Sequence, residues 1–431
     1  MKAVIMAGGK GTRMATLGSD LPKPMLPLGG KPILAHEIAC LVKEGITDIV
    51  LVVGHLGHVI KNYFGDGRTF GARITYFEES EPLGTAGALY HLKPTLTDDD
   101  FLLLGADLLF DVDLSHFLAY HRERGGLATL LTHPSTHLFD SVAVYADENG
   151  RVRALLPPAA DRAITANRTN AGLQICAPAL LDRLTGAGRL DLDREVLAPL
   201  ATEGLLYAYN SPEYVKDVGT PERLASGEHD LAAGYPQKAY LGKKRPAVFL
   251  DRDGTINRHI SFLSRPDQIE LLPRAAEAIR LLNERHIPVI VATNQPVIAR
   301  GDVTREGLAA IHGRLACLLA EQGAFVNDIF YCPHHPDGGF AGEVPALKTD
   351  CACRKPEPGL LLQAAARYNL DLPRSVMIGD RDTDVMAGKR AGCLTAKIGN
   401  STKGLIPDCH ADITGESLYE CIVKFLESEG L

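Results

Sequence analysis

The sequence predicts an α/β protein with two Rossmann-like domains, because short runs of Val, Ile and Leu alternate with helical stretches in both halves of the chain. The alternation begins at Lys2–Met6 and begins again at Ala247–Leu250, each time followed by its own loop motif. Such alternation is typical of βαβ units, whose strands lie mostly parallel in one sheet. The length of 431 residues fits two or three domains of roughly 100–200 residues each.

The apolar runs of the first half predict buried strands, and the amphipathic stretches between and after them predict helices. The strands are expected at Lys2–Met6, Asp48–Val53, Arg73–Phe77 and Phe101–Leu104, and the helices at Pro32–Glu44 and Leu114–Arg122. The second half repeats the order of strand, helix, strand and helix, at Ala247–Leu250, Pro273–Arg285, Pro288–Ala292 and Arg305–Gln322. Further αβ units follow to about Ile398.

A stretch rich in glycine, with one proline and a basic cluster, separates the two patterns. It contains Gly227, Gly234, Pro236, Gly242 and Lys243-Lys244-Arg245. Such composition indicates a linker. We therefore predict domains at residues 1–228 and 245–431, joined by a linker at 229–244.

Composition excludes several classes of protein. Apolar residues make up 45% and charged residues 23% of the chain, as in globular proteins. The formal charge of −8 argues against a nucleic-acid partner and against a polybasic membrane surface. No apolar run approaches the ~18 residues of a membrane span, and the first apolar stretch is too short for a signal peptide. Nine cysteines cannot all pair within the chain, which favours the cytoplasm. The composition leaves a homo-oligomer open.

A glycine-rich loop with two cations follows the first predicted strand. It reads Ala7-Gly8-Gly9-Lys10-Gly11-Thr12-Arg13. Glycines let a backbone approach phosphate groups with its N–H groups pointing at them, and Lys10 and Arg13 would neutralise the phosphates. The loop fits neither a Walker motif nor a dinucleotide fingerprint. A tight turn without a ligand is the plain alternative.

Four later elements strengthen the phosphate interpretation. Lys23 stands between Pro22 and Pro24, which restrict the backbone and aim the side chain; a surface lysine is the alternative. The segment from Gly84 to Gly87 could let the backbone approach a nucleobase edge. Asp107 follows a predicted strand and suits a metal ion, although a helix cap would use the same residue type. Asp217 could share that ion.

Together these motifs resemble those of the sugar-1-phosphate nucleotidyltransferases, over residues 1 to about 228. The family pattern also includes Asn170-Ala171-Gly172, and the segments 110–114 and 195–197 resemble heptose-1-phosphate guanylyltransferases, which use GTP and Mg²⁺. The resemblance implies a nucleotidyltransferase fold and the following roles. The triphosphate would bind at Gly8, Gly9, Gly11, Thr12 and Arg13; Lys23 would act in catalysis with Arg13; the base would lie near Gly84 and Gly87; the sugar would contact Asn170; and Mg²⁺ would bind Asp107 and Asp217.

Two departures from that family pattern concern the residues around the site. Gly105-Ala106 precedes Asp107 where the family has Asn-Gly, and the usual Glu-Lys-Pro element is missing around Leu155–Pro158. The second departure bears on which sugar is accepted.

The second domain opens with two aspartates, Asp251 and Asp253, directly after a predicted strand. Alternate residues of an extended chain point to the same side, and the two carboxylates would repel each other without a cation between them. Asp251 can form an aspartyl phosphate, while Asp253 can protonate the leaving group and later activate water. A calcium loop is the alternative, but its remaining ligands are missing.

Three later positions complete the second set: Thr293 at a strand end, Lys355, and Asp380 after another strand. The set matches the haloacid-dehalogenase superfamily, which implies that Asp251, Asp253, Thr293 and Lys355 are catalytic. It also implies Mg²⁺ bound by Asp251, by Asp253 through its carbonyl, and by Asp380, with Asp384 orienting its neighbours. Substrate contacts are implied at Asn294, Arg300 and Arg354.

Three cysteines and one histidine predict a structural zinc site in the same domain. Cys332 and His334 form one pair, and Cys351 and Cys353 form the other. Three thiolates and one imidazole make a closed tetrahedral site. His335 is the alternative to His334. The other six cysteines are expected to be small buried apolar residues.

The zinc loop narrows the resemblance to capless phosphatases that act on heptose 1,7-bisphosphate and to the related histidinol-phosphate phosphatases. Pro296-Val297 departs from the Ser-Gly of that family. The combined resemblance implies removal of the 7-phosphate, followed by transfer of GMP from GTP to heptose 1-phosphate, with sugar phosphates as the other substrates. The alternatives are a mannose-1-phosphate or other sugar-1-phosphate nucleotidyltransferase fused to a different phosphatase, and a regulatory nucleotide-binding domain without turnover.

Overall fold

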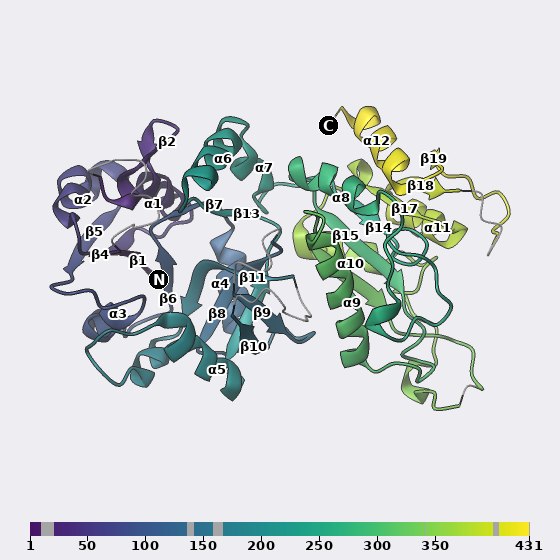
Figure 1. The fold of residues 1–431 in the computed structure, drawn as a ribbon, viewed down its shortest axis with the longest axis horizontal. Helices are drawn as coiled ribbons and strands as arrows, with labels where there is room; N and C mark the ends of the chain where they lie inside the picture. Colours follow the sequence, from purple (N-terminus) through teal and green to yellow (C-terminus); the bar gives the residue numbers. More distant parts are fainter. Residues whose placement is uncertain (10–20, 136–141, 158–166, 340, 400–404, 431) are drawn as a thin grey trace. The chain divides into compact units, whose positions relative to one another are not determined.

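The computed structural model describes residues 1–9, 21–135, 142–157, 167–339, 341–399 and 405–430. Two compact units divide the chain (Figure 1). The first comprises Met1–His133, Val144–Pro157 and Thr169–Leu241, and most of the second is Gly242–Leu431. Within the described ranges, no helix is long and apolar enough to cross a membrane.

The first unit is built on a mixed sheet with β1 (Lys2–Ala7) at its centre. On one side of β1 lie β4 (Asp48–Val53) and β5 (Arg73–Glu78), and on the other lies β6 (Phe101–Gly105); these four strands are parallel. The sheet continues from β6 through antiparallel β11 to β8 and β9, and from those to β12 and β10. Those strands span Thr169–Cys176, Ala128–His133, Ala143–Ala146, Leu206–Asn210 and Val152–Leu156.

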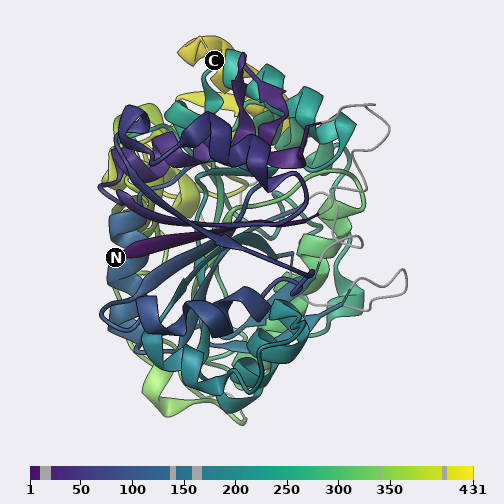
Figure 2. The same ribbon diagram turned by 90° about the vertical axis from the view of Figure 1, so that its left-hand side faces the viewer.

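Helices cover both faces of this sheet because its central strands are apolar on both sides (Figure 2). Ile5 faces the core that contains α1 (Ile33–Lys43), α2 (Gly57–Phe64) and α4 (Leu114–Arg124). Val4 faces the opposite core, with α3 (Gly87–Leu92) and α5 (Ala198–Glu203). The predicted strands and helices of this half are therefore present, with ends shifted by one or two residues.

The predicted linker differs from the structure. Helix α6 (Pro221–Ala232) crosses its start and α7 (Tyr235–Ala239) lies within it. Their apolar side chains pack into a cluster with the small strand pair β7 (Leu108–Asp111) and β13 (Tyr214–Asp217). Composition alone did not predict these helices, because Pro236 occupies the first turn of α7, where proline is compatible with a helix.

The second unit contains a six-stranded parallel sheet in the order β16-β15-β14-β17-β18-β19. Its strands span Val248–Leu250 (β14), Val289–Asn294 (β15), Asp328–Cys332 (β16), Val376–Gly379 (β17), Leu394–Ile398 (β18) and Ile413–Gly415 (β19). Helices α8 (Ala275–Glu284), α9 (Arg305–Ala320) and α12 (Leu418–Glu429) share one core with alternate strand residues. On the other face, α11 (Asp382–Ala391) packs Gly388 against Met377, and α10 (Gly359–Tyr368) packs beside β15 and β16.

In both sheets, the direction in which the chain adds strands reverses beside the first strand. In the first unit the chain moves outward from β1 to β4 and β5 and then returns to place β6 on the other side. In the second unit it moves from β14 to β15 and β16 and then places β17 on the other side. Ligands of parallel α/β sheets bind at the carboxyl ends of the strands at such a switch point. Each unit therefore offers one crevice, between β1 and β6 and between β14 and β17.

Candidate functional site

The first crevice carries the start of the glycine loop and one predicted metal carboxylate. Gly8 and Gly9 follow β1, and Asp107 follows β6. Gly8 lies against the side chain of Glu79, so that a Cβ at Gly8 would overlap the carboxylate. The remaining predicted loop residues, Gly11, Thr12 and Arg13, lie outside the described residues.

Lys23, Asp107 and Asp217 converge beside Gly219. The Lys23 ammonium forms an ion pair with the Asp107 carboxylate. Asp217 accepts hydrogen bonds from the Gly219 N–H at 2.6 Å and from Arg223 Nη1 at 2.7 Å. A Cβ at Gly219 would overlap both Lys23 Nζ and Asp217 Oδ1, which shows how closely the two side chains approach. The structure thus brings together three residues that lie far apart in the sequence.

The predicted base-binding and sugar-binding residues have partners within the chain. Gly84 has a φ of +79°, and a Cβ there would lie 2.5 Å from the Leu190 carbonyl oxygen. Gly87 is equally close to the Gly188 carbonyl. Asn170 Oδ1 accepts from the Gly172 N–H at 3.0 Å. Close packing of two loops therefore explains both glycines without a ligand, and their contact with a base remains a prediction.

Glu37 is a residue of this region that the sequence reading missed. Its side chain is 1% exposed, on an otherwise apolar face of α1, and its Oε1 accepts from the Leu108 N–H at 2.7 Å. Burial raises the pKa of Glu37 well above its usual value, and the charges of Asp107 and Lys23 also act on it. The sequence pattern could have indicated this residue, since a glutamate at an apolar position of an amphipathic helix is unusual.

The second crevice holds a buried lysine among carboxylates. Lys355 Nζ lies 2.9 Å from Asp251 Oδ1 and 2.6 Å from Asp384 Oδ1, and all three side chains are buried. Asp251 follows β14, and Asp380 follows β17. Burial, followed by the charge of Asp251, raises the pKa of Asp380. Asp384 thus contacts the Lys355 ammonium directly, which is compatible with the orienting role that the resemblance implies.

The carboxylate group fits a divalent cation. Oxygen atoms of Asp251, Asp380 and Asp384 all lie within 4.8 Å of one another. Asp380 Oδ1 is buried and accepts no hydrogen bond from the described residues. A hard cation such as Mg²⁺ prefers carboxylate ligands and would satisfy that oxygen.

The Asp253 carboxylate is turned into a buried network and lies outside that group. It accepts from Arg252 Nη2 at 2.7 Å, from Asn257 Nδ2 at 3.0 Å and from Gln295 Nε2 at 3.0 Å. Burial would raise the pKa of Asp253, but the charge and hydrogen bonds of Arg252 lower it below its usual value. Metal binding by Asp253 would thus have to use its carbonyl, and this role remains a prediction.

Three residues predicted to contact the phosphate or the substrate have different neighbours in the structure. Thr293 is buried, and its Oγ1 accepts from Gln295 Nε2 at 3.0 Å. Asn294 uses its amide on the main chain of Lys355, donating to the carbonyl at 2.9 Å and accepting from the N–H at 3.0 Å. Arg300 pairs with Asp302 at 2.9 Å and lies over the Phe262 ring. Asn294 therefore holds the main chain of Lys355 in place, and its contact with a substrate remains a prediction.

The predicted zinc ligands form a cluster at the end of β16. Cys332 Sγ lies 3.5 Å from Cys351 Sγ and 3.6 Å from His334 Nδ1, and Cys353 Sγ lies 3.3 Å from both Cys351 Sγ and His334 Nδ1. With zinc–sulfur bonds of about 2.3 Å, neighbouring ligands of a tetrahedral site are roughly 3.8 Å apart, so the set fits zinc.

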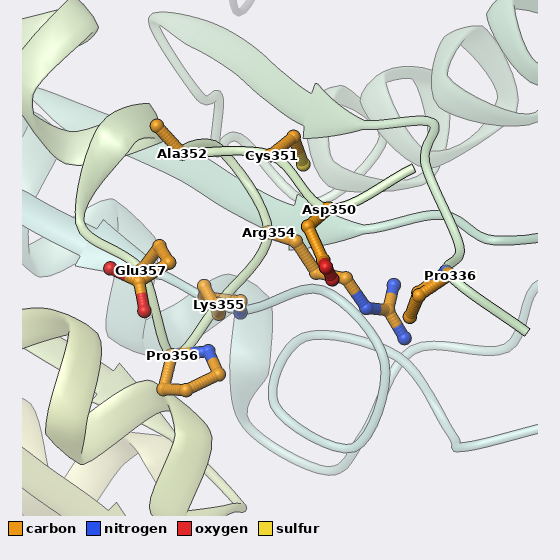
Figure 3. A pocket seen from close by; sticks show the side chains of 8 residues that line it. All are labelled: Pro336, Asp350, Cys351, Ala352, Arg354, Lys355, Pro356 and Glu357. Atoms are coloured by element: carbon orange, nitrogen blue, oxygen red, sulfur yellow. The ribbon is translucent and has the colours of Figure 1, made fainter. Parts of the chain in front are cut away.

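The cluster borders a cavity that two cations line. Arg354 and Lys355 line this cavity together with Cys351 and Glu357 (Figure 3). Arg354 Nη1 donates to the His334 carbonyl at 3.1 Å. His335 lies outside the four-ligand cluster, and its Nδ1 accepts from the Asp337 N–H at 3.1 Å. The structure thus groups His334, rather than His335, with the three cysteines, and zinc binding there remains a prediction.

Comparison with known proteins identifies both units. Residues 2–233 match the family model described as nucleotidyl transferase, and residues 352–407 match the model described as HAD-hydrolase-like. The chain is 32% identical over 234 residues to mannose-1-phosphate guanyltransferase beta-A of Xenopus laevis, a match that covers 53% of this chain and 63% of the relative. It therefore spans less than two thirds of that relative's length.

Two further relatives cover the two halves of the chain. A D-glycero-beta-D-manno-heptose-1,7-bisphosphate 7-phosphatase of Mesorhizobium japonicum is 46% identical over 147 residues, covering 34% of this chain and 66% of the relative. The crystal structure of HddC from Yersinia pseudotuberculosis aligns with a TM-score of 0.48 and 21% identity, over 53% of this chain and 99% of that chain. The predicted pair of folds is confirmed: the chain belongs to the nucleotidyl transferase family and carries a HAD-like domain after its nucleotidyltransferase domain.

Proposed function

We propose that the chain is a bifunctional enzyme that removes the 7-phosphate of a heptose 1,7-bisphosphate and then transfers GMP from GTP to the resulting heptose 1-phosphate. The observation that carries the proposal is the buried Asp251–Lys355 pair beside the four-ligand cysteine and histidine cluster, in a chain that also has a nucleotidyltransferase domain. The similarity to a heptose bisphosphate phosphatase supports the substrate. We assign the two steps to residues 245–431 and 1–228.

In the phosphatase step, an Asp251 carboxylate oxygen attacks phosphorus, and the bond from phosphorus to the sugar oxygen breaks. Asp253, in the protonated form that this step requires, gives its proton to that oxygen, which leaves an aspartyl phosphate; because the pKa of Asp253 is lowered in the described site, that proton is taken up together with the substrate. Asp253 then takes a proton from the water that attacks this intermediate, so phosphate departs and Asp251 is restored. Lys355 and Thr293 hold the phosphate oxygens. Mg²⁺ bound by Asp251, Asp380 and the Asp253 carbonyl would neutralise phosphate charge.

In the transferase step, an oxygen of the sugar 1-phosphate attacks the α-phosphorus of GTP, and the bond to pyrophosphate breaks. No protein nucleophile is needed, so alignment and charge neutralisation supply the catalysis. Lys23 would stabilise the developing charge, and the loop from Gly8 to Arg13 would hold the triphosphate. Mg²⁺ held by Asp107 and Asp217 would screen the phosphates, and both carboxylates are hard oxygen ligands suited to it.

One observation supports an alternative sugar phosphate as the substrate of the transferase step. Three relatives that match the first unit at 31–33% identity are mannose-1-phosphate guanylyltransferases. Mannose 1-phosphate is therefore the competing substrate of the transferase step. We also propose a cytoplasmic location, because none of the nine cysteines is in a disulfide.

The test is incubation of the full chain with heptose 1,7-bisphosphate, Mg²⁺ and each of GTP, ATP, UTP, CTP and dTTP. We expect phosphate release followed by GDP-heptose and pyrophosphate, with GTP preferred. Asp251→Asn should stop phosphate release and leave transfer from GTP to heptose 1-phosphate intact. Faster transfer to mannose 1-phosphate would favour the second sugar, and no pyrophosphate with any pair would refute the transferase assignment.

A further inference from the structure

The side chain of Gln295 lies between Asp253 and Thr293 and donates a hydrogen bond to each. In the proposed phosphatase reaction, Asp253 serves the leaving oxygen and Thr293 binds the phosphate. It is 2% exposed and follows directly after β15. Its main-chain N–H donates to the Cys332 carbonyl at 2.8 Å, which extends the pairing of β15 with β16. The backbone of Gln295 is therefore fixed, and its side chain reaches the site from a rigid strand end.

The orientation of the Gln295 amide follows from its neighbours. Its Oε1 accepts from Arg252 Nη2 at 3.0 Å, and its Nε2 donates to Asp253 Oδ2 at 3.0 Å. The opposite orientation would turn the amide N–H groups toward a guanidinium and the amide oxygen toward a carboxylate. Both contacts would then be repulsive, so only one orientation is stable.

The same Nε2 atom also donates to Thr293 Oγ1 at 3.0 Å. A threonine hydroxyl has one proton to donate and two lone pairs that accept. Because one lone pair is engaged by Gln295, the hydroxyl proton of Thr293 is left to point elsewhere. A phosphate held on Asp251 is the acceptor that the proposed reaction would supply.

We propose that Gln295 is a positioning residue that orients the acid Asp253 and the phosphate-binding hydroxyl of Thr293 through one amide group. The inference rests on the proposed phosphatase function. Arg252, which is fully buried, completes the arrangement by donating to both Asp253 oxygens, from Nε at 3.2 Å and from Nη2 at 2.7 Å. Arg252 and Gln295 together thus restrict Asp253 to one rotamer.

The test compares two phosphate esters in the wild type and in Gln295→Glu. This variant retains an oxygen acceptor for Arg252 but loses both N–H donors, and its carboxylate would repel Asp253. Hydrolysis of p-nitrophenyl phosphate needs no acid, because nitrophenolate leaves readily. A primary alkyl phosphate such as glycerol 3-phosphate, or heptose 1,7-bisphosphate itself, needs a proton from Asp253. We expect kcat for the alkyl ester to fall about 100-fold and that for the aryl ester about 10-fold or less.

Gln295→Leu, which lacks both donors and the acceptor, should show the same selective loss. Gln363→Glu makes the same substitution as the first variant on the exposed side of α10 and should change neither rate. The melting temperature of each Gln295 variant shows whether it is folded like the wild type. If a folded Gln295 variant loses the same fraction of kcat with both esters, or loses none, the positioning role of Gln295 is refuted. The proposed phosphatase function would not be affected by that result. If the wild type hydrolyses neither ester, the proposed phosphatase function fails, and the inference fails with it. If the wild type hydrolyses the simple esters and not the heptose bisphosphate, only the proposed substrate fails.

Discussion

Lys355 Nζ lies 2.9 Å from Asp251 Oδ1 in the buried centre of the second unit. A third group, Asp384, approaches the same ammonium at 2.6 Å. Burial would lower the pKa of Lys355, but the charges of Asp251 and Asp384 more than offset this, and the pKa lies above its usual value. The lysine therefore stays charged, and it compensates two carboxylates that would otherwise be buried alone.

Replacement of Lys355 by methionine should therefore affect both turnover and folding. The phosphatase rate should fall by about 100-fold or more, because the phosphate loses a buried cation. The free energy of unfolding should fall by about 3–5 kcal/mol, because two buried carboxylates lose their counter-charge. Urea unfolding and phosphate release measure the two effects.

The double variant Lys355→Met/Asp384→Leu separates these effects. It removes one of the uncompensated carboxylates and should recover part of the lost stability, but not the lost activity. A single Lys355→Met variant that unfolds like the wild type would contradict the assignment of Lys355 as the compensating charge.

Lys23→Met should lower the rate of nucleotidyl transfer by about 100-fold or more, because Lys23 is the described cation that pairs with Asp107. The phosphatase rate should remain unchanged, since that site lies in the other unit. Lys31→Met, an exposed change in the short strand β3 (Lys31–Pro32), serves as the control. An equal effect of the two variants on pyrophosphate release would show that Lys23 acts only as a surface charge.

Cys353→Ser should reduce the bound zinc, measured by mass spectrometry of the metal, from one equivalent to a small fraction. The melting temperature should fall by roughly 6–12 °C, as expected for a loss of about 3 kcal/mol in a unit of this size. Phosphatase activity should fall with it, because Lys355 follows Cys353 by two residues.

The matched control for the metal site is Cys409→Ser, which changes a thiol that is outside the cluster and contacts the Asp382 carbonyl. It should retain the zinc. Full zinc content in Cys353→Ser would refute the four-ligand assignment.

His312 should make folding sensitive to acid. Its Nε2 is buried without a hydrogen-bond partner among the described residues, and burial, followed by the charge of Arg252, lowers the pKa of His312 to about 3. In the unfolded chain a histidine titrates near 6.5, so the unfolded state binds the proton first. The contribution to stability is complete above about pH 6.5 and is lost as the pH falls toward 3, at up to about 1.4 kcal/mol per pH unit.

Urea unfolding between pH 7.5 and 4.5 measures this slope. The stability of His312→Gln should fall less steeply with decreasing pH than that of the wild type. The exposed control His55→Asn should follow the wild type. Parallel curves for the wild type and His312→Gln would contradict a buried neutral histidine.

The sequence predicted most strands and helices because both sheets are apolar on both faces and their strands stand out as runs of Val, Ile and Leu. It also placed Asp107, Asp251 and Asp380 correctly at strand ends, since the carboxyl ends of parallel strands share one edge of a sheet. The linker prediction failed at α6 and α7, because glycine and proline occur at helix ends as well as in loops.

Local sequence determined the residue types of both sites: two aspartates after one strand, a lysine between prolines, and two short cysteine motifs. Only the tertiary structure decided how these residues are paired. It directed Asn294 to the main chain of Lys355, buried Glu37 against the main chain of Leu108, and joined Gln295 to both Asp253 and Thr293. A side-chain hydrogen bond depends on distances of a few tenths of an ångström between segments far apart in the chain, and no local pattern encodes those distances.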